Sequence, residues 1–187
     1  MDAPTIAEML KFSNLQMAAE ALYGYSTRKR DPASMPPGDL LSKTGHFSGA
    51  IPSEILRDGN EHASRFVPTE AEKFTGQWVV VDHLSNTTTG FNGTLFFNEA
   101  ERQYVLSFRS TEFIDDALRD SSGTNRLEIV DRGWAFGRID DMEAWYRQLR
   151  DSGKLRAGAH FSVTGCSLGG HLATAFNLLH GAETLAD

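Results

Sequence analysis

The 187-residue chain lacks several features that would assign it to a class at once. Its single cysteine, Cys166, cannot form an intrachain disulfide or a cysteine-based zinc site, although this does not fix the compartment. No apolar run approaches the roughly 20 residues that cross a bilayer. The N-terminus lacks the basic and apolar regions of a conventional signal peptide, so export would require another route.

Positive charge is also scarce. The formal net charge is −7, which argues against nucleic acid as a partner because phosphates select basic surfaces. The only basic run, residues 28–30, lies among glycine, serine, aspartate and proline and is interpreted as a solvated loop. With 40% hydrophobic residues, the chain is long enough for one domain with a core.

The first part of the chain predicts one helix followed by irregular structure. Residues 5–23 place apolar side chains at steps of mostly three and four, which indicates an amphipathic helix. The apolar positions are Ile6, Met9, Leu10, Leu15, Ala18, Ala19 and Leu22. We expect this face to pack on its own domain, although such a face can also lie on a membrane surface. Residues 24–68, rich in glycine, proline, serine and aspartate, predict a long loop region with short helical turns.

From residue 78 onward, strand and helix patterns alternate, which predicts an α/β fold. The predicted strands are residues 78–81, 91–97, 104–108 and 161–164, and the predicted helices are residues 139–149 and the segment from residue 168 onward. The second and third strands are expected to form a hairpin. The apolar face of the last helix is expected to contain Leu168, Leu172, Ala175, Phe176 and Leu179.

The turn between the last strand and the last helix carries the strongest chemical signal. Gly165, Ser167 and Gly169 form a G-x-S-x-G pattern, which between a strand and a helix is the nucleophile elbow of α/β-hydrolases. Small residues are needed on either side of the serine because the turn is tight. The N–H of Leu168 would point at the reacting carbonyl oxygen. Cys166 is expected to face away from the apex and pack as a small hydrophobe rather than act as a thiol nucleophile.

Three ordered motifs over residues 78–180 resemble those of class 3 lipases. Residues 108–120, FRSTEFIDDALRD, are similar to the family's F-R-G-T-x(4)-D-W-x-x-D, residues 130–134, VDRGW, to V-H-x-G-F, and residues 163–170, VTGCSLGG, to V-T-G-H-S-L-G-G. The resemblance implies an incomplete α/β-hydrolase sheet. Residues 1–77 would be an N-terminal helix and loop extension, and residues 78–187 the N-terminal portion of the hydrolase domain, truncated after the elbow helix.

The resemblance also implies roles for particular residues. Ser167 matches the nucleophile, and Leu168 and Thr111 match the two oxyanion donors. Gly165 and Gly169 support the elbow. Arg109, Asp116 and Asp120 match residues that support the first motif, although helix N-terminal acids and a surface ion pair account for them almost as well. The sequence departs from the family at Ser110, Ala117, Asp131 and Cys166, and none of these changes removes a group that performs the chemistry.

The serine lacks an evident general base. In this fold the expected order is serine, then an acid, then histidine, and only His171, His180, Glu183 and Asp187 follow Ser167 as candidates. Each of the two histidines lies on the elbow helix or at its end, whereas a productive base comes from a loop above the sheet. The earlier His46, His62 and His83 are interpreted as surface or loop histidines. We therefore expect the aspartate and histidine of the triad to lie outside this chain.

The predicted function is a serine carboxylic-ester hydrolase of the lipase, esterase or phospholipase type, acting through an acyl-enzyme on an ester or lipid. A non-catalytic binding or assembly module, or a pseudo-hydrolase fragment of a larger secreted protein, is the alternative, and acyl transfer shares the same residues. No metal or other cofactor is predicted in this segment, because Asp115, Asp116 and Asp120 lack calcium-loop spacing. The looser resemblance of residues 1–77 to large bacterial lipase-like secreted proteins implies calcium in a C-terminal region and export without a signal peptide; a cytoplasmic location is the alternative. Expected partners are the remainder of the same protein or a second copy, with transient contact at a lipid interface.

Overall fold

The computed structural model describes residues 5–21, 23, 46–59, 65–85, 87–110 and 133–184. The elements in these ranges are α1 (Ile6–Ala19), β1 (His46–Ala50), α2 (Ser53–Asp58), α3 (Pro68–Thr75), β2 (Trp78–Leu84), β3 (Gly93–Asn98), β4 (Gln103–Phe108), α5 (Phe136–Asp151), β5 (Phe161–Gly165) and α6 (Leu168–His180). No helix within these ranges combines the length and the apolar character that a membrane crossing needs. The predicted hairpin, the later strand and the two later helices are confirmed.

The strands form one mixed sheet in the order β1-β2-β3-β4-β5. Strands β1 to β4 are paired antiparallel, and β5 is paired parallel to β4, from Tyr104↔Phe161 to Phe108↔Gly165. Parallel neighbours require a crossover connection, and the connection between β4 and β5 contains α5. The predicted α/β class is therefore confirmed at the level of a mixed five-stranded sheet with helices.

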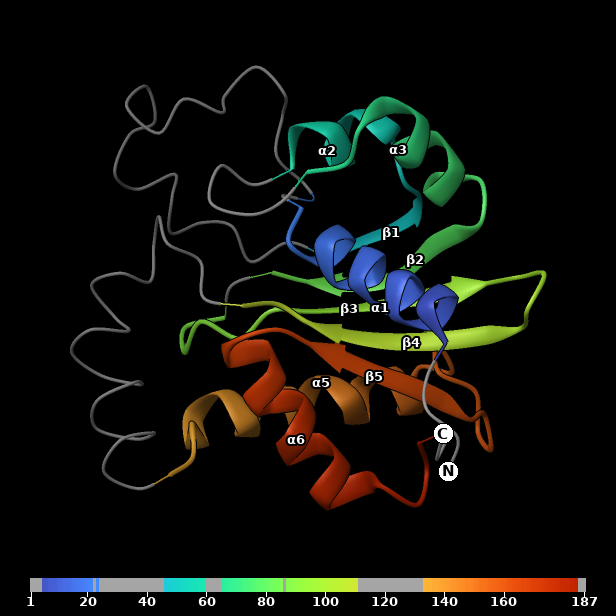
Figure 1. The fold of residues 1–187 in the computed structure, drawn as a ribbon. Helices are drawn as coiled ribbons and strands as arrows, with labels where there is room; N and C mark the ends of the chain where they lie inside the picture. Colours follow the sequence, from blue (N-terminus) through green and yellow to red (C-terminus); the bar gives the residue numbers. More distant parts are fainter. Residues whose placement is uncertain are drawn as a thin grey trace, which may run out of the picture.

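Helices cover both faces of the sheet (Figure 1). One buried cluster lies between the sheet and α1, α2 and α3, and a second lies between the sheet and α5 and α6. Successive side chains of a strand point to opposite faces, so Phe96 and Val105 belong to the first cluster, whereas Leu95 and Leu106 belong to the second. The carboxyl ends of β4 and β5 consequently emerge between two packed layers.

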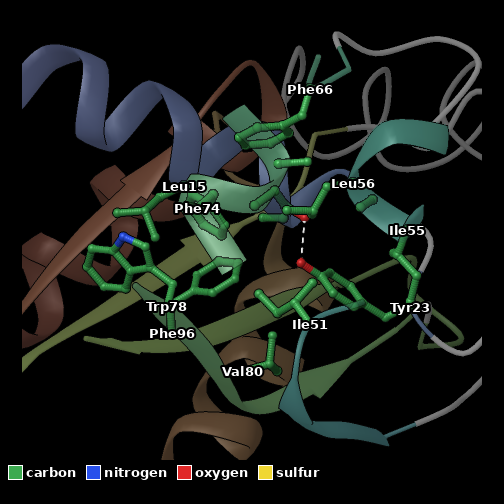
Figure 2. Close-up of a cluster of buried hydrophobic side chains, with 14 of the residues drawn as sticks. Leu15, Tyr23, Ile51, Ile55, Leu56, Phe66, Phe74, Trp78, Val80 and Phe96 are labelled. Carbon is green, nitrogen blue, oxygen red and sulfur yellow. Dashed lines mark hydrogen bonds between the residues drawn. The ribbon is translucent and has the colours of Figure 1, made fainter. Parts of the chain in front are cut away.

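The first cluster shows which part of α1 holds the helix on the sheet (Figure 2). Leu15, Ala18 and Ala19 are fully buried, and the Tyr23 hydroxyl donates a hydrogen bond to the carbonyl oxygen of Ala18 at 2.9 Å. The amino-terminal half of the helix behaves differently from the prediction, because Ile6, Met9 and Leu10 are exposed. Only the carboxyl-terminal half of α1 is therefore anchored in the core.

Two further expectations need correction. Residues 24–68 were expected to be loop with short helical turns, yet residues 46–50 form β1, the edge strand paired with β2. Four of its five residues are exposed, so the strand lacks the alternating pattern that marks a half-buried strand. On α6, Leu179 was expected on the buried face but is 57% exposed.

Candidate functional site

Ser167 occupies a strained turn between β5 and α6. Its backbone angles are φ 53° and ψ −120°, and among the described non-glycine residues only Arg102 also has a positive φ. Such a conformation costs an L-residue about 1–3 kcal/mol and persists only where the surroundings impose it. The residue is exposed at the start of α6, where the helix dipole favours negative charge. The sharp turn predicted from the G-x-S-x-G pattern is present at this serine.

The two flanking glycines are required by close backbone contacts. A Cβ added at Gly165 would overlap the carbonyl of Gly169, and a Cβ at Gly169 would overlap the carbonyl of Phe108; both approaches are closer than the 3.0 Å that real Cβ atoms respect. At Gly170 the nearest atom to an added Cβ is 3.3 Å away, which is tight but attainable. The first turn of α6 is therefore pressed against the end of β4.

This arrangement brings the elbow beside the segment that follows β4. Phe108 pairs with Gly165 at the last position of the parallel register, so residues 109–110 and residues 166–167 leave the sheet at the same edge. Leu168 is the first residue of α6, and its N–H has no intrahelical acceptor because of that position. Its side chain is buried. Thr111, Asp116 and Asp120, with Asp115, lie outside the described residues, and their predicted roles stay predictions.

Arg109 and Ser110 are held from the opposite side by α1. The Arg109 side chain is buried, and its Nε lies 3.4 Å from Glu20 Oε2. The Ser110 N–H donates a hydrogen bond to Glu20 Oε1 at 2.8 Å. The alternative interpretation of Arg109 as part of a surface ion pair is therefore wrong. Sequence reasoning missed Glu20, whose only signal was an acidic residue directly after the buried positions of an apolar helix.

No described histidine hydrogen-bonds to the Ser167 hydroxyl. His171 accepts a hydrogen bond at Nε2 from the Ala135 N–H at 3.3 Å, its ring lies 4.9 Å from that of Trp134, and burial lowers its pKa. His180 Nε2 lies 2.8 Å from Glu143 Oε1, at the opposite end of α6. Nε2 of each of these two candidate bases is therefore engaged by a group other than the Ser167 hydroxyl.

Of the three earlier histidines that were considered, the structure places two, on strands β1 and β2. His46 is half-exposed on β1, where its Nδ1 lies 3.4 Å from Asp82 Oδ1, and His62 lies outside the described residues. His83 was expected at the surface, but this interpretation is wrong. It is fully buried and shares a 2.8 Å hydrogen bond with the Thr94 hydroxyl. Burial, together with the nearby charges of Arg109 and His46, lowers the pKa of His83 to about 3.

Cys166 is exposed beside the serine. The expectation that it packs as a small hydrophobe is wrong for the described fold. The turn directs both residue 166 and residue 167 outward and buries Leu168 instead.

No group of three or more histidine, cysteine, aspartate or glutamate side chains in the described part of the chain gathers in a way that could hold a metal ion. Comparison with known proteins adds no assignment: no protein-family model, curated protein or solved structure matches this chain. The candidate site therefore consists of three features. Ser167 is strained and exposed, the Leu168 N–H is at the start of α6, and Glu20 contacts the segment that follows β4.

Proposed function

We propose that this protein is a serine carboxylic-ester hydrolase of the lipase, esterase or phospholipase type, with Ser167 as its nucleophile. The observation that supports the proposal most is the positive φ of Ser167 between two glycines that cannot carry a side chain. A strained serine at a strand-to-helix turn is the arrangement that exposes a nucleophile in α/β-hydrolases. In the proposed architecture, the mixed sheet is an incomplete α/β-hydrolase sheet.

The proposed reaction has two stages. The Ser167 Oγ attacks the ester carbonyl carbon while a general base removes its proton, and the carbonyl oxygen becomes negative. The N–H of Leu168 donates a hydrogen bond to that oxygen, and the N–H of Thr111 is proposed as the second donor. The C–O bond to the alcohol then breaks, the alcohol takes the proton from the base, and an acyl-serine remains. Water attacks this ester by the same route and releases the acid.

The proposal assigns the general base and its orienting carboxylate to residues beyond those described. His171 already accepts a hydrogen bond from the Ala135 N–H, and His180 contacts Glu143 at the other end of α6. Since nucleophile, base and acid act as a unit, a chain without the last two should retain little turnover.

A fluorophosphonate probe tests the proposal directly. It should attach to Ser167 in the protein as its host cell makes it, and peptide mass spectrometry should locate the adduct on that residue. Ser167→Ala should abolish the adduct, whereas Ser152→Ala, at an exposed helix end, should leave it unchanged. A folded wild-type protein that stays unlabelled, or an adduct on another residue, would contradict the proposal.

One observation favours a second candidate, a non-catalytic binding or assembly module. Within the described residues no side chain hydrogen-bonds to the Ser167 hydroxyl, although an activated serine needs a base within hydrogen-bond reach. A module of this kind would bind a fluorescent ester analogue with the same affinity before and after Ser167→Ala, and it would show no phosphonate adduct. The hydrolase proposal requires the adduct.

A further inference from the structure

The carboxylate of Glu20 contacts the backbone that leaves β4 beside the elbow. Glu20 is the C-cap that follows the last residue of α1, and it is only 6% exposed. Its Oε1 accepts the Ser110 N–H at 2.8 Å, and its Oε2 lies 3.4 Å from Arg109 Nε. One buried side chain from the N-terminal helix therefore holds two consecutive residues of the segment next to the nucleophile.

Glu20 is itself fixed by a second polar contact from the same helix. Gln16 Nε2 donates to Glu20 Oε1 at 2.8 Å, and Gln16 Oε1 accepts from the Ser107 hydroxyl at 3.0 Å. Ser107 is fully buried on β4. The helix is thus hydrogen-bonded to β4 at Ser107, and its C-cap Glu20 is hydrogen-bonded to the segment after β4 at Ser110, which fixes both the end of the strand and the direction in which the chain leaves it.

The elbow contacts the same segment from the side of α6. Gly169 is packed against the carbonyl groups of Phe108 and Arg109 so closely that a Cβ there would overlap them. The backbone of residues 108–110 is therefore held between the first turn of α6 and the Glu20 carboxylate. The Glu20 contact and the first turn of α6, which begins with Leu168, thus meet the same stretch of backbone from two sides.

We propose that Glu20 is a positioning residue for the ester-hydrolysis site, because it sets the Arg109–Ser110 backbone against the elbow. The inference rests on the proposed function. Glu20 does not touch the reacting atoms; it acts through Ser110 and Arg109. The negative charge is required as well as the acceptor oxygen, because Arg109 is a buried cation that Glu20 compensates. The N-terminal helix thereby becomes a part of the catalytic domain rather than an appendage.

The chain offers a matched control on the same helix. Lys11 Nζ lies 3.3 Å from Glu101 Oε2, so Glu101 also joins α1 to the sheet, but at the turn that precedes β4. Glu20→Gln removes the charge near the elbow and keeps an acceptor oxygen of the same size. Glu101→Gln makes the same chemical change at the far end of the strand. Because the Glu20 side chain is buried and that of Glu101 is about half exposed, a difference between the two variants reports on the location and the burial of the carboxylate together.

The test measures phosphonylation of Ser167 at several fluorophosphonate concentrations, which separates the maximal rate constant from the apparent probe affinity. In Glu20→Gln we expect the maximal rate constant to fall by roughly 10- to 100-fold, since small displacements of catalytic geometry have effects of this size. The apparent affinity should change by no more than about two-fold, because Glu20 is buried and does not itself contact the probe. Glu101→Gln should match the wild type in both quantities.

The outcomes are distinguishable. If the wild type is not labelled at Ser167, the hydrolase proposal fails, and the role of Glu20 fails with it. If the wild type is labelled and folded Glu20→Gln is labelled at the same maximal rate, only the role of Glu20 is overturned. Loss of folded protein lowers the amount of adduct rather than its rate constant, so partial unfolding is separated from mispositioning. Glu20→Asp, which keeps the charge, should recover part of the lost rate.

Discussion

Replacement of Ser167 by glycine should stabilise this protein relative to replacement by alanine. Both changes remove the hydroxyl and therefore any phosphonate adduct, but only alanine keeps the Cβ that the positive φ of 53° strains. Glycine adopts positive φ without that cost. The comparison of the two variants thus measures backbone strain at residue 167 independently of any chemistry of the hydroxyl.

Two opposing contributions set the expected difference in free energy of unfolding between the glycine and the alanine variant. Relief of the strain is worth about 1–3 kcal/mol. Glycine also makes the unfolded chain more flexible, which lowers the stability of the folded state by about 0.4–1 kcal/mol. The free energy of unfolding of Ser167→Gly should therefore exceed that of Ser167→Ala by about 1 kcal/mol. In a chain of 187 residues this corresponds to a melting temperature higher by about 2–4 °C.

Urea and thermal unfolding of both variants at one pH provide the assay, and Ser152 provides the control. Ser152 is the C-cap of α5 and has right-handed angles of φ −78° and ψ −8°, which alanine adopts without strain. Glycine there should be less stable than alanine by about 0.4–1 kcal/mol, because it makes the unfolded chain more flexible. The two positions should thus give differences of opposite sign. A glycine variant at Ser167 that is also less stable than its alanine counterpart would refute the strained elbow, and with it the main support for the hydrolase proposal.

Three other predictions concern packing and pH. Gly169→Ala should lower the melting temperature by several degrees more than Gly170→Ala, because only the first places a Cβ into a carbonyl group of β4; equal effects measured by thermal unfolding would contradict this. The neutral form of His83 is favoured in the folded state, so the free energy of unfolding should fall as the pH decreases from about 6.5 towards 3. The loss should reach about 3 kcal/mol at pH 4. The urea midpoint of His83→Gln should depend less on pH than that of the wild type. Tyr23→Phe should cost about 1 kcal/mol through loss of the buried bond to the Ala18 carbonyl, and an unchanged urea midpoint would show that this bond contributes nothing.

The elements were predictable where a local pattern specified them. Helix α5 and the β3–β4 hairpin appear where periodicity and turn residues indicated, since each is encoded within a short segment. Strand β1 was missed because most of its side chains face outward and its partner, β2, lies far along the chain. The buried face of α1 was only half predicted. Periodicity identifies an apolar stripe, but the length of sheet beneath the stripe decides how much of it is covered.

The same distinction holds for the site. The turn at Ser167 was predictable because the serine and its two glycines lie within five consecutive positions. Glu20 was not, because its contact with Ser110 joins residues 90 positions apart. The burial of His83 was hidden for a similar reason, since Tyr23 from another segment lies over its ring at a centroid distance of 4.7 Å. A polar residue whose partner lies far away in the sequence produces no periodic pattern in its own segment.

The order of strand pairing has a consequence for how the protein is made. Strands β2, β3 and β4 are consecutive in the sequence and adjacent in the sheet, so they can pair through contacts between residues that are close in sequence. The β4–β5 pairing, in contrast, joins residue 104 to residue 161 and must first close a long loop, which slows folding. Ser167, the proposed nucleophile, lies at this late-forming boundary. A newly synthesised chain should therefore possess most of its sheet, with the edge of β4 still open, before it possesses any reactive centre.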